Sequence, residues 1–246
     1  MIHRTRRVAF GLFTMLTIVF SGWTAAAQTP SADERFEVTS IKMARAPLLE
    51  TIMALQMRDI ARAKEAFDAY DGVWNGIEVY VNIRSKEMYQ AIELNFQARI
   101  AKALGAPNPD IPALLADAQA MLAKYDQMIE LVQKSAPLNP LYDDVARLRI
   151  VRSALREIDP ALKAGNVVKA RKYNDDFQDG WFNIEDFVRS RSLDAYVAIE
   201  GGMVHLSEAL MPDKPDLAQV AALINAVMAQ YNAVVIELMK EARNQR

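Results

Sequence analysis

Apolar residues recur every three or four positions from about residue 46 to the end of the chain. This spacing places them on one face of a helix, whereas a half-buried strand would show strict alternation. Glycine and proline gather in a few short stretches between these segments, which is typical of loops. Only residues 35–42 alternate, weakly, and we interpret them as a lead-in to the first helix. The pattern therefore predicts an all-α fold.

Capping and turn residues set the boundaries of the expected helices. Asp110 and Asp216 have the residue type and position of N-caps, and Pro47 suits a first helical turn. Two long segments each contain an Asp-Gly pair, at 71–72 and 179–180, where we expect an interruption. The expected helical segments cover residues 46–57, 59–104, 110–134, 141–157, 167–210 and 216 onward.

The chain contains an internal repeat, which we call the signature string. Residues 74–93 read WNGIEVYVNIRSKEMYQAIE and residues 181–200 read WFNIEDFVRSRSLDAYVAIE, with ten of twenty positions identical at an offset of 107. The match resumes after a one-residue gap and extends to Tyr125 and Tyr231, at an offset of 106. The identical residues of the first copy are Trp74, Ile77, Glu78, Val81, Arg84, Ser85, Tyr89, Ala91, Ile92 and Glu93.

The repeat predicts two copies of one helical unit, the first over residues 45–138 and the second over residues 139–246. Each copy presents an apolar stripe that the other copy can bury. We therefore expect one antiparallel helical bundle with pseudo-two-fold symmetry, made of two internally duplicated units. A tandem arrangement of the two units, as in an α-solenoid, is the alternative.

The N-terminus has the three parts of a secretory signal peptide, over residues 1–27. A start with three arginines is followed by an uncharged, mostly apolar run at 8–20 and by three alanines at 25–27. Residues 28–44 are expected to form a flexible leader. We predict a periplasmic or secreted protein without a stable membrane span after processing. An uncleaved N-terminal anchor is the alternative.

Composition narrows the classes of function. The chain has no cysteine, which excludes disulfides, thiolate catalysis and covalent haem attachment. It has 29 basic and 31 acidic residues without a basic stripe, so we expect no nucleic-acid partner. Because no glycine-rich phosphate loop or catalytic motif occurs, we also expect no bound nucleotide and no enzyme activity. His205 is the histidine that remains after the predicted signal peptide is removed, and Glu208 lies three residues further on.

Four recurring carboxylates form the candidate site. They are Glu78, Glu93, Glu185 and Glu200. Hard cations such as iron(III), manganese or calcium prefer carboxylate oxygen, so the four suggest a metal site. Tyr89 and Tyr196 recur beside them and could donate to these oxygens or ligate iron(III). Alternatively, the carboxylates have only a structural role. Arg84 and Arg191 would then compensate their charge, because an unpaired buried charge is costly.

A shared metal site requires the two copies to meet. On one straight helix Glu78 and Glu93 would lie about 22 Å apart, too far to share an ion. Antiparallel copies would bring Glu78 near Glu200, or near Glu185 if the helices cross close to those residues. The sequence predicts one of these two arrangements if a metal is bound.

The signature string resembles one in the extracytoplasmic helical region of some bacterial high-affinity iron permeases. It is also distantly similar to the imelysin-like and EfeO-like periplasmic proteins of iron uptake. The imelysin-like group carries a G-x-H-x-x-E metal motif, of which this chain has only His205 and Glu208, with Met203 in the glycine position. The resemblance implies an all-α periplasmic protein that handles or relays iron.

These observations lead to two main hypotheses for the function. The first is a non-enzymatic helical protein that binds or relays a metal ion, most simply iron, with an inner-membrane permease or envelope complex as its partner. The second is a ligand-free helical scaffold or interaction module of an envelope complex. A bundle that binds a small molecule is a third hypothesis. Neither haem nor a nucleotide is expected as a cofactor.

Overall fold

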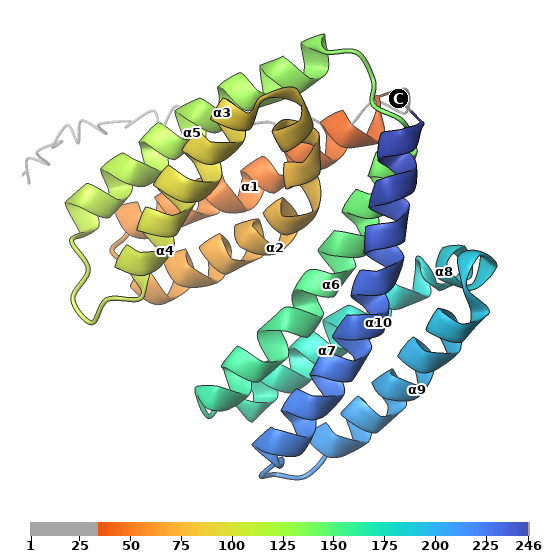
Figure 1. Cartoon of the computed structure of the whole chain (residues 1–246). Coiled ribbons are helices and arrows are strands. Elements are labelled where there is room, and N and C mark those ends of the chain that lie inside the picture. Colours follow the sequence, from red (N-terminus) through yellow and green to blue (C-terminus); the bar gives the residue numbers. More distant parts are fainter. Residues whose placement is uncertain (1–33, 246) are drawn as a thin grey trace, which may run out of the picture. The chain divides into compact units, whose positions relative to one another are not determined.

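The computed structural model describes residues 34–245, and every regular element in this range is a helix (Figure 1). This confirms the all-α prediction for the described part of the chain. The predicted signal peptide, residues 1–27, lies outside the described residues. In chain order the helices are α1 (Phe36–Gln56), α2 (Ile60–Arg84), α3 (Lys86–Gln90), the π-helical η1 (Ala91–Gln97), α4 (Ala98–Leu104), α5 (Ile111–Lys134), α6 (Leu141–Lys163), α7 (Val167–Phe182), α8 (Glu185–Arg191), α9 (Leu193–Leu210) and α10 (Leu217–Asn244).

Helix α1 begins at Phe36, within the stretch 28–44 that we expected to be a flexible leader. That expectation was wrong beyond residue 35, because apolar side chains there continue the helical spacing. Ile41 and Leu48 are both fully buried in the core. Pro47 accordingly lies inside α1 rather than in its first turn. Burial of the apolar face of α1 compensates for the backbone donor that proline lacks.

The first long segment is broken at Ser85 and not at the Asp-Gly pair 71–72, which lies inside the unbroken helix α2. Ser85 is extended, with φ −151° and ψ 100°. Its Oγ accepts a hydrogen bond from the backbone N–H of Met88 at 3.1 Å. Ser85 thereby ends α2 and caps α3, and the chain folds back along α2.

Ser192 has the same role in the second half. It is extended, with φ −153° and ψ 101°, and its Oγ accepts from the backbone N–H of Ala195 at 3.1 Å. Helix α7 ends at Phe182, two residues after the Asp-Gly pair 179–180, and α8 begins at Glu185, so the second half has an interruption close to the predicted one. In the first half the pair stays helical, since a glycine costs a helix only about 1 kcal/mol, which tertiary packing can supply. The Arg-Ser pair of the signature string therefore marks the helix break that the two halves share.

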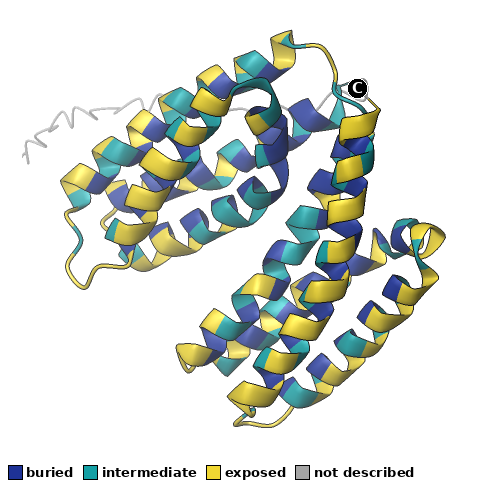
Figure 2. Cartoon of the chain, in the orientation of Figure 1, coloured by how far each residue is buried: buried dark blue, intermediate teal, exposed yellow. Residues whose placement is uncertain are grey.

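Buried side chains form two clusters, one mainly within α1–α5 and one within α6–α10 (Figure 2). In each half the first helix packs against the second and the last: α1 against α2 and α5, and α6 against α7 and α10. This differs from the single shared core expected of one pseudo-two-fold bundle. Each half buries most of its apolar face within itself, and Tyr142, Ala146 and Ala242 of the second half complete the first cluster.

Helices α2 and α6 join the two clusters and approach each other closely. Gly76 lies at their contact, where an added Cβ would be only 2.6 Å from the carbonyl oxygen of Ala146. The absence of a side chain on Gly76 therefore sets the spacing of the two helices. Because α6 also packs against α7 and α10, it belongs to the packing of both halves.

The same tyrosine hydrogen bond occurs in both halves. The hydroxyl of Tyr125 donates to the carbonyl oxygen of Ile41 at 2.9 Å, and that of Tyr231 donates to the carbonyl oxygen of Leu148 at 2.8 Å. These pairs are related by the offsets of the internal repeat, 107 residues for α1 and α6 and 106 for α5 and α10. The match supports the interpretation of the halves as copies and gives a residue-by-residue correspondence between them.

The π-helical segment η1 accounts for the one-residue gap in the repeat. In α9 the buried residues Ile199 and Met203 are four positions apart, whereas the corresponding buried residues of η1, Ile92 and Gln97, are five apart. A π turn accommodates one extra residue in a helix. The first half therefore carries one residue more than the second, and η1 restores the register of the buried face.

Candidate functional site

The two signature tryptophans hydrogen-bond the glutamates that end their strings. Trp74 Nε1 donates to the Glu93 carboxylate, and Trp181 Nε1 donates to the Glu200 carboxylate. Both tryptophan side chains are fully buried. A buried indole N–H needs an acceptor, and the glutamate supplies it. Glu93 and Glu200 therefore have a structural role that explains why Trp and Glu recur together.

The expected separation of Glu78 and Glu93 does not hold, because the chain folds back at Ser85 and brings the two carboxylates together. Burial raises the pKa of Glu78, and the charge of Glu93 raises it further, whereas Arg149 opposes the shift. Arg149 Nη1 lies 3.1 Å from Glu78 Oε1. Burial and the charges of Glu78 and Glu93 raise the pKa of Tyr89, so this tyrosine lies beside both carboxylates.

The second half brings Glu185 and Glu200 together in the same way. Desolvation and the negative charge of Glu200 raise the pKa of Glu185. Tyr196 stacks on Trp181, with ring centroids 6.3 Å apart. Neither Glu185 nor Glu200 forms an ion pair with any residue that the structure describes. The two carboxylates of the second half thus lack the arginine that Glu78 has in the first.

The signature arginines do not compensate these carboxylates, so that expectation was wrong. Arg84 pairs with Glu37 of α1, with Nη2 and Oε2 2.7 Å apart and both side chains almost fully buried. Arg191 pairs with Glu241 of α10 at 2.5 Å, on a more exposed surface. Both arginines directly precede the helix break, so the reversal of the chain directs them toward other helices.

The fit to a hard cation differs between the halves. Over residues 34–245 no three or more His, Asp or Glu side chains are placed to hold one metal ion, so the four signature glutamates do not converge. In both halves a tryptophan N–H donates to the second glutamate, but in the first half Arg149 also pairs with Glu78 and neutralises one of the two carboxylates. In the second half Glu185 and Glu200 supply two carboxylates, and further ligands would have to come from water.

His205 and Glu208 lie together on the rim of a pocket of about 450 Å³ near the start of α10. Lys214 and Asp216 line the same pocket, so its charges are mixed. Asp216 uses a side-chain oxygen to cap α10. This pocket therefore does not supply the motif that the imelysin-like proteins carry.

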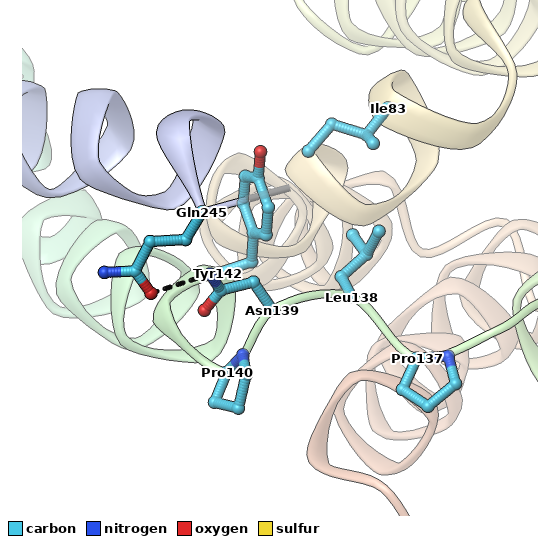
Figure 3. A pocket seen from close by; sticks show the side chains of 7 residues that line it. All are labelled: Ile83, Pro137, Leu138, Asn139, Pro140, Tyr142 and Gln245. Atoms are coloured by element: carbon cyan, nitrogen blue, oxygen red, sulfur yellow. Dashed lines mark hydrogen bonds between the residues drawn. The ribbon is translucent and has the colours of Figure 1, made fainter.

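Another pocket, of about 640 Å³, lies beside the connection between the two halves (Figure 3). None of its lining residues carries a formal charge. Asn139 Nδ2 donates to Gln245 Oε1 at 3.1 Å within it. The pocket offers surface for packing, and the group lining it that is capable of acid–base chemistry is the hydroxyl of Tyr142, which has no hydrogen-bond partner among the described residues.

Several polar residues lie near the glutamates in the structure but were not indicated by the sequence patterns. Burial raises the pKa of Asp71, which accepts hydrogen bonds from Asn75 and Gln97. Arg149 and Arg152 on α6 face α2 and α10 and have buried Nε atoms. The recurrence of cations every three or four residues on α6 was the only sequence pattern that could have indicated them.

Helix α10 is long and apolar enough to cross a membrane, with a mean hydropathy of 1.4 over its best window, and it is the one such helix among the described residues. The same helix packs against α6 and α9 and contributes Tyr231 and Leu238 to the second core. Its length and composition are therefore also those of a core helix.

Comparisons with protein-family models, with curated proteins and with solved structures find no match to this chain. The resemblance to iron-permease extracytoplasmic regions and to imelysin-like proteins therefore rests on the signature string and stays a prediction.

Proposed function

We propose that this protein is a non-enzymatic helical scaffold of the cell envelope that self-associates through the exposed face of α9. The observation that supports this is a row of large apolar residues at exposed positions of that helix, and Figure 2 shows the exposed positions of α9 in yellow. Leu193, Val197 and Val204 are 61%, 59% and 56% exposed. They lie on one side of α9, and the exposed Gly201 lies between them. Such a row of exposed apolar side chains is typical of an interaction surface.

The first half provides an internal comparison for this stripe. Leu193 and Val197 correspond to Lys86 and Gln90 at the repeat offset of 107. Val204 corresponds to Ala98 at the offset of 106, so the equivalent surface of the first half is polar at two of the three stripe positions and has a smaller apolar residue at the third. The stripe is not a requirement of the helical unit, because the first half folds without it.

A second copy of the chain fits the stripe best. An added Cβ at Gly201 would meet nothing within 4 Å, so a neighbouring helix can approach closely there. Two α9 helices crossing in antiparallel at Gly201 would bring the apolar stripes of the two copies into contact, as in an isologous interface.

Sedimentation velocity of the purified chain tests this proposal. We expect the wild type to form a dimer at micromolar concentration and Val197→Lys/Val204→Lys to be monomeric with unchanged helicity, because two charges would be buried at the interface. Gln90→Lys, at the matched position of the first half, is the control and should remain a dimer. A monomeric wild type, or a dimer that the double substitution leaves intact, would refute self-association through α9.

A second candidate function is the binding or relay of a hard cation such as iron(III) or manganese for an uptake system. It is favoured by Glu185 and Glu200, the carboxylate pair without a described cationic partner. The Trp181 N–H holds Glu200 in place, as second-shell donors do for metal-binding carboxylates. Two protein ligands would bind such an ion weakly and exchange it readily, which suits a relay to a permease.

Calorimetric titration with iron(III) and manganese tests the cation proposal. We expect Glu200→Gln and Glu185→Gln to abolish binding, because each removes half of the protein's ligand charge. Glu78→Gln is the matched control in the first half and should bind as wild type does. The absence of micromolar binding by wild type would end this candidate and leave the scaffold proposal unaffected.

A further inference from the structure

A pocket of about 390 Å³ lies between α6 and α10, and four cationic side chains line it without an acidic one. We call it the α6–α10 pocket. Its cations are Arg149, Arg152, Lys240 and Arg243. Like charges placed together repel one another and create a positive potential in the cavity. Such a site is electrostatically complementary to an anion.

The first half carries counterparts of three of these cations, each with an acidic partner, whereas Arg243 corresponds to Pro137. Arg152 corresponds to Arg45, whose Nε and Nη2 donate to both oxygens of Asp126, at 2.6 and 3.0 Å. At the matched position of the second half stands Asn232, so Arg152 has lost its carboxylate. The Arg152 guanidinium now donates to the neutral amide oxygen of Asn232.

A second acid is lost on the same helix. Lys134 of α5 pairs with Glu130 at 2.9 Å, and the corresponding residues of α10 are Lys240 and Ile236. Lys240 instead contacts Glu237, at 2.7 Å, and both side chains of that pair are largely exposed. The second half has therefore kept its cations and replaced two of their acidic partners with uncharged residues.

A third acid is lost where α6 begins. Lys42 pairs with Glu34 at 2.5 Å in the first half, and the corresponding residues are Arg149 and Leu141. Arg149 is compensated by Glu78 of α2 alone. The Nε atoms of Arg149 and Arg152 are buried and have no hydrogen-bond partner among the described residues. Buried donors without acceptors are costly, and an anion in the pocket would supply acceptors.

The mutual repulsion of the arginines on α6 also favours a bound anion. Burial, and then the positive charges of Arg149 and Arg156, lower the pKa of Arg152. The cations of α6 thus destabilise one another in the present arrangement. A bound anion would offset both the burial and the mutual repulsion.

The floor of the pocket is apolar. Val235, Ile236 and Met239 of α10 line it beside the cations. Small-molecule sites combine such apolar surface with a few convergent polar groups, in cavities of roughly 300–1,000 Å³. We propose that the α6–α10 pocket binds a small organic anion, with its phosphate or carboxylate group on the arginines and its carbon skeleton on the apolar floor.

Calorimetric titration of the full protein in a phosphate-free buffer of low ionic strength tests this site. The probes are phenyl phosphate, benzoate and inorganic phosphate, and the tighter of the two aromatic probes identifies the head group. We expect that probe to bind at least tenfold more tightly than inorganic phosphate, because only the aromatic probes contact the apolar floor. Affinity should fall with added salt, since the pocket is open to solvent.

Asn232→Asp is the decisive variant, because it restores the acid that the first half has at this position. It should weaken binding at least tenfold while the melting temperature stays the same or rises, so a loss of fold cannot explain the loss of binding. Lys240→Gln should weaken binding as well, whereas Lys134→Gln, its counterpart in the first half, should not. No binding of any probe at millimolar concentration, equal affinity of Asn232→Asp and wild type, or inorganic phosphate binding as tightly as both aromatic probes would overturn the proposal.

Discussion

Replacement of Trp74 or Trp181 by alanine is expected to lower the free energy of unfolding by about 3–5 kcal/mol, as for other large core aromatics. Both side chains are fully buried. Trp74 packs against Tyr70 and Tyr125, with ring centroids 6.1 and 6.3 Å away. Each substitution opens a cavity and also removes the indole donor from a glutamate. Urea unfolding followed by far-UV circular dichroism measures the effect.

Phe182→Ala is the matched control for Trp181, because Phe182 is the next residue and is 64% exposed. It should change the stability by no more than about 0.5 kcal/mol, as surface substitutions usually do. Trp181→Phe separates packing from hydrogen bonding, since it keeps a ring but leaves Glu200 without its donor, at a cost of about 1–3 kcal/mol. Equal stability of Trp181→Ala and Phe182→Ala would contradict the core assignment of the tryptophan.

The helical periodicity and the capping residues predicted the fold class and several helix ends. Helix α5 begins immediately after Asp110 and α10 immediately after Asp216, and both aspartates accept hydrogen bonds from the first turn. These features are local, because an N-cap contacts backbone groups only two or three residues away. Local sequence is sufficient to place such ends.

The helix break inside the signature string could not be predicted in the same way. Ser85 lies in a periodic apolar pattern, whereas the Asp-Gly pair at 71–72 is a stronger local indication of a turn. Packing of the folded-back segment decides between the two, and packing involves residues far apart in the sequence. The error had a direct consequence for the site, because a straight helix would separate Glu78 from Glu93.

The partners of the charged residues were missed for the same reason. Glu78 pairs with Arg149, 71 residues further along the chain, and Arg84 pairs with Glu37, 47 residues before it. No spacing within one helix indicates such pairs. Once the tyrosine hydrogen bonds align the halves, however, the loss of the acids opposite Arg152 and Lys240 can be read directly from the sequence.

The surfaces on which the proposed functions depend lie mainly in the second half. In the first half charged side chains pair with one another, as Arg45 does with Asp126. In the second half, Asn232 leaves a cation without its acid, and Glu185 and Glu200 have no described cationic partner. After a duplication, one copy can retain the interactions that stabilise the unit while the other exchanges them for binding. The pair of Glu185 and Glu200, the α6–α10 pocket and the α9 stripe all belong to helices of the second half.

Arg84→Gln is expected to destabilise the protein by about 3 kcal/mol, because it leaves the carboxylate of Glu37 buried without its main partner. The side chains of Arg84 and Glu37 are only 6% and 4% exposed. Arg35 also contacts Glu37, at 2.7 Å, but its side chain is 28% exposed and its interaction is more strongly screened by water. Thermal and urea unfolding at neutral pH measure the loss.

Arg191→Gln is the matched variant at the second copy of the signature string. The side chains of Arg191 and Glu241 are 33% and 41% exposed, so breaking their pair should cost no more than about 1 kcal/mol. The double variant Arg84→Met/Glu37→Met should recover most of the stability that Arg84→Gln loses, since it removes the uncompensated charge. Equal losses for Arg84→Gln and Arg191→Gln would show that burial does not distinguish these two ion pairs. The helix break would then be the remaining role of the Arg-Ser pair.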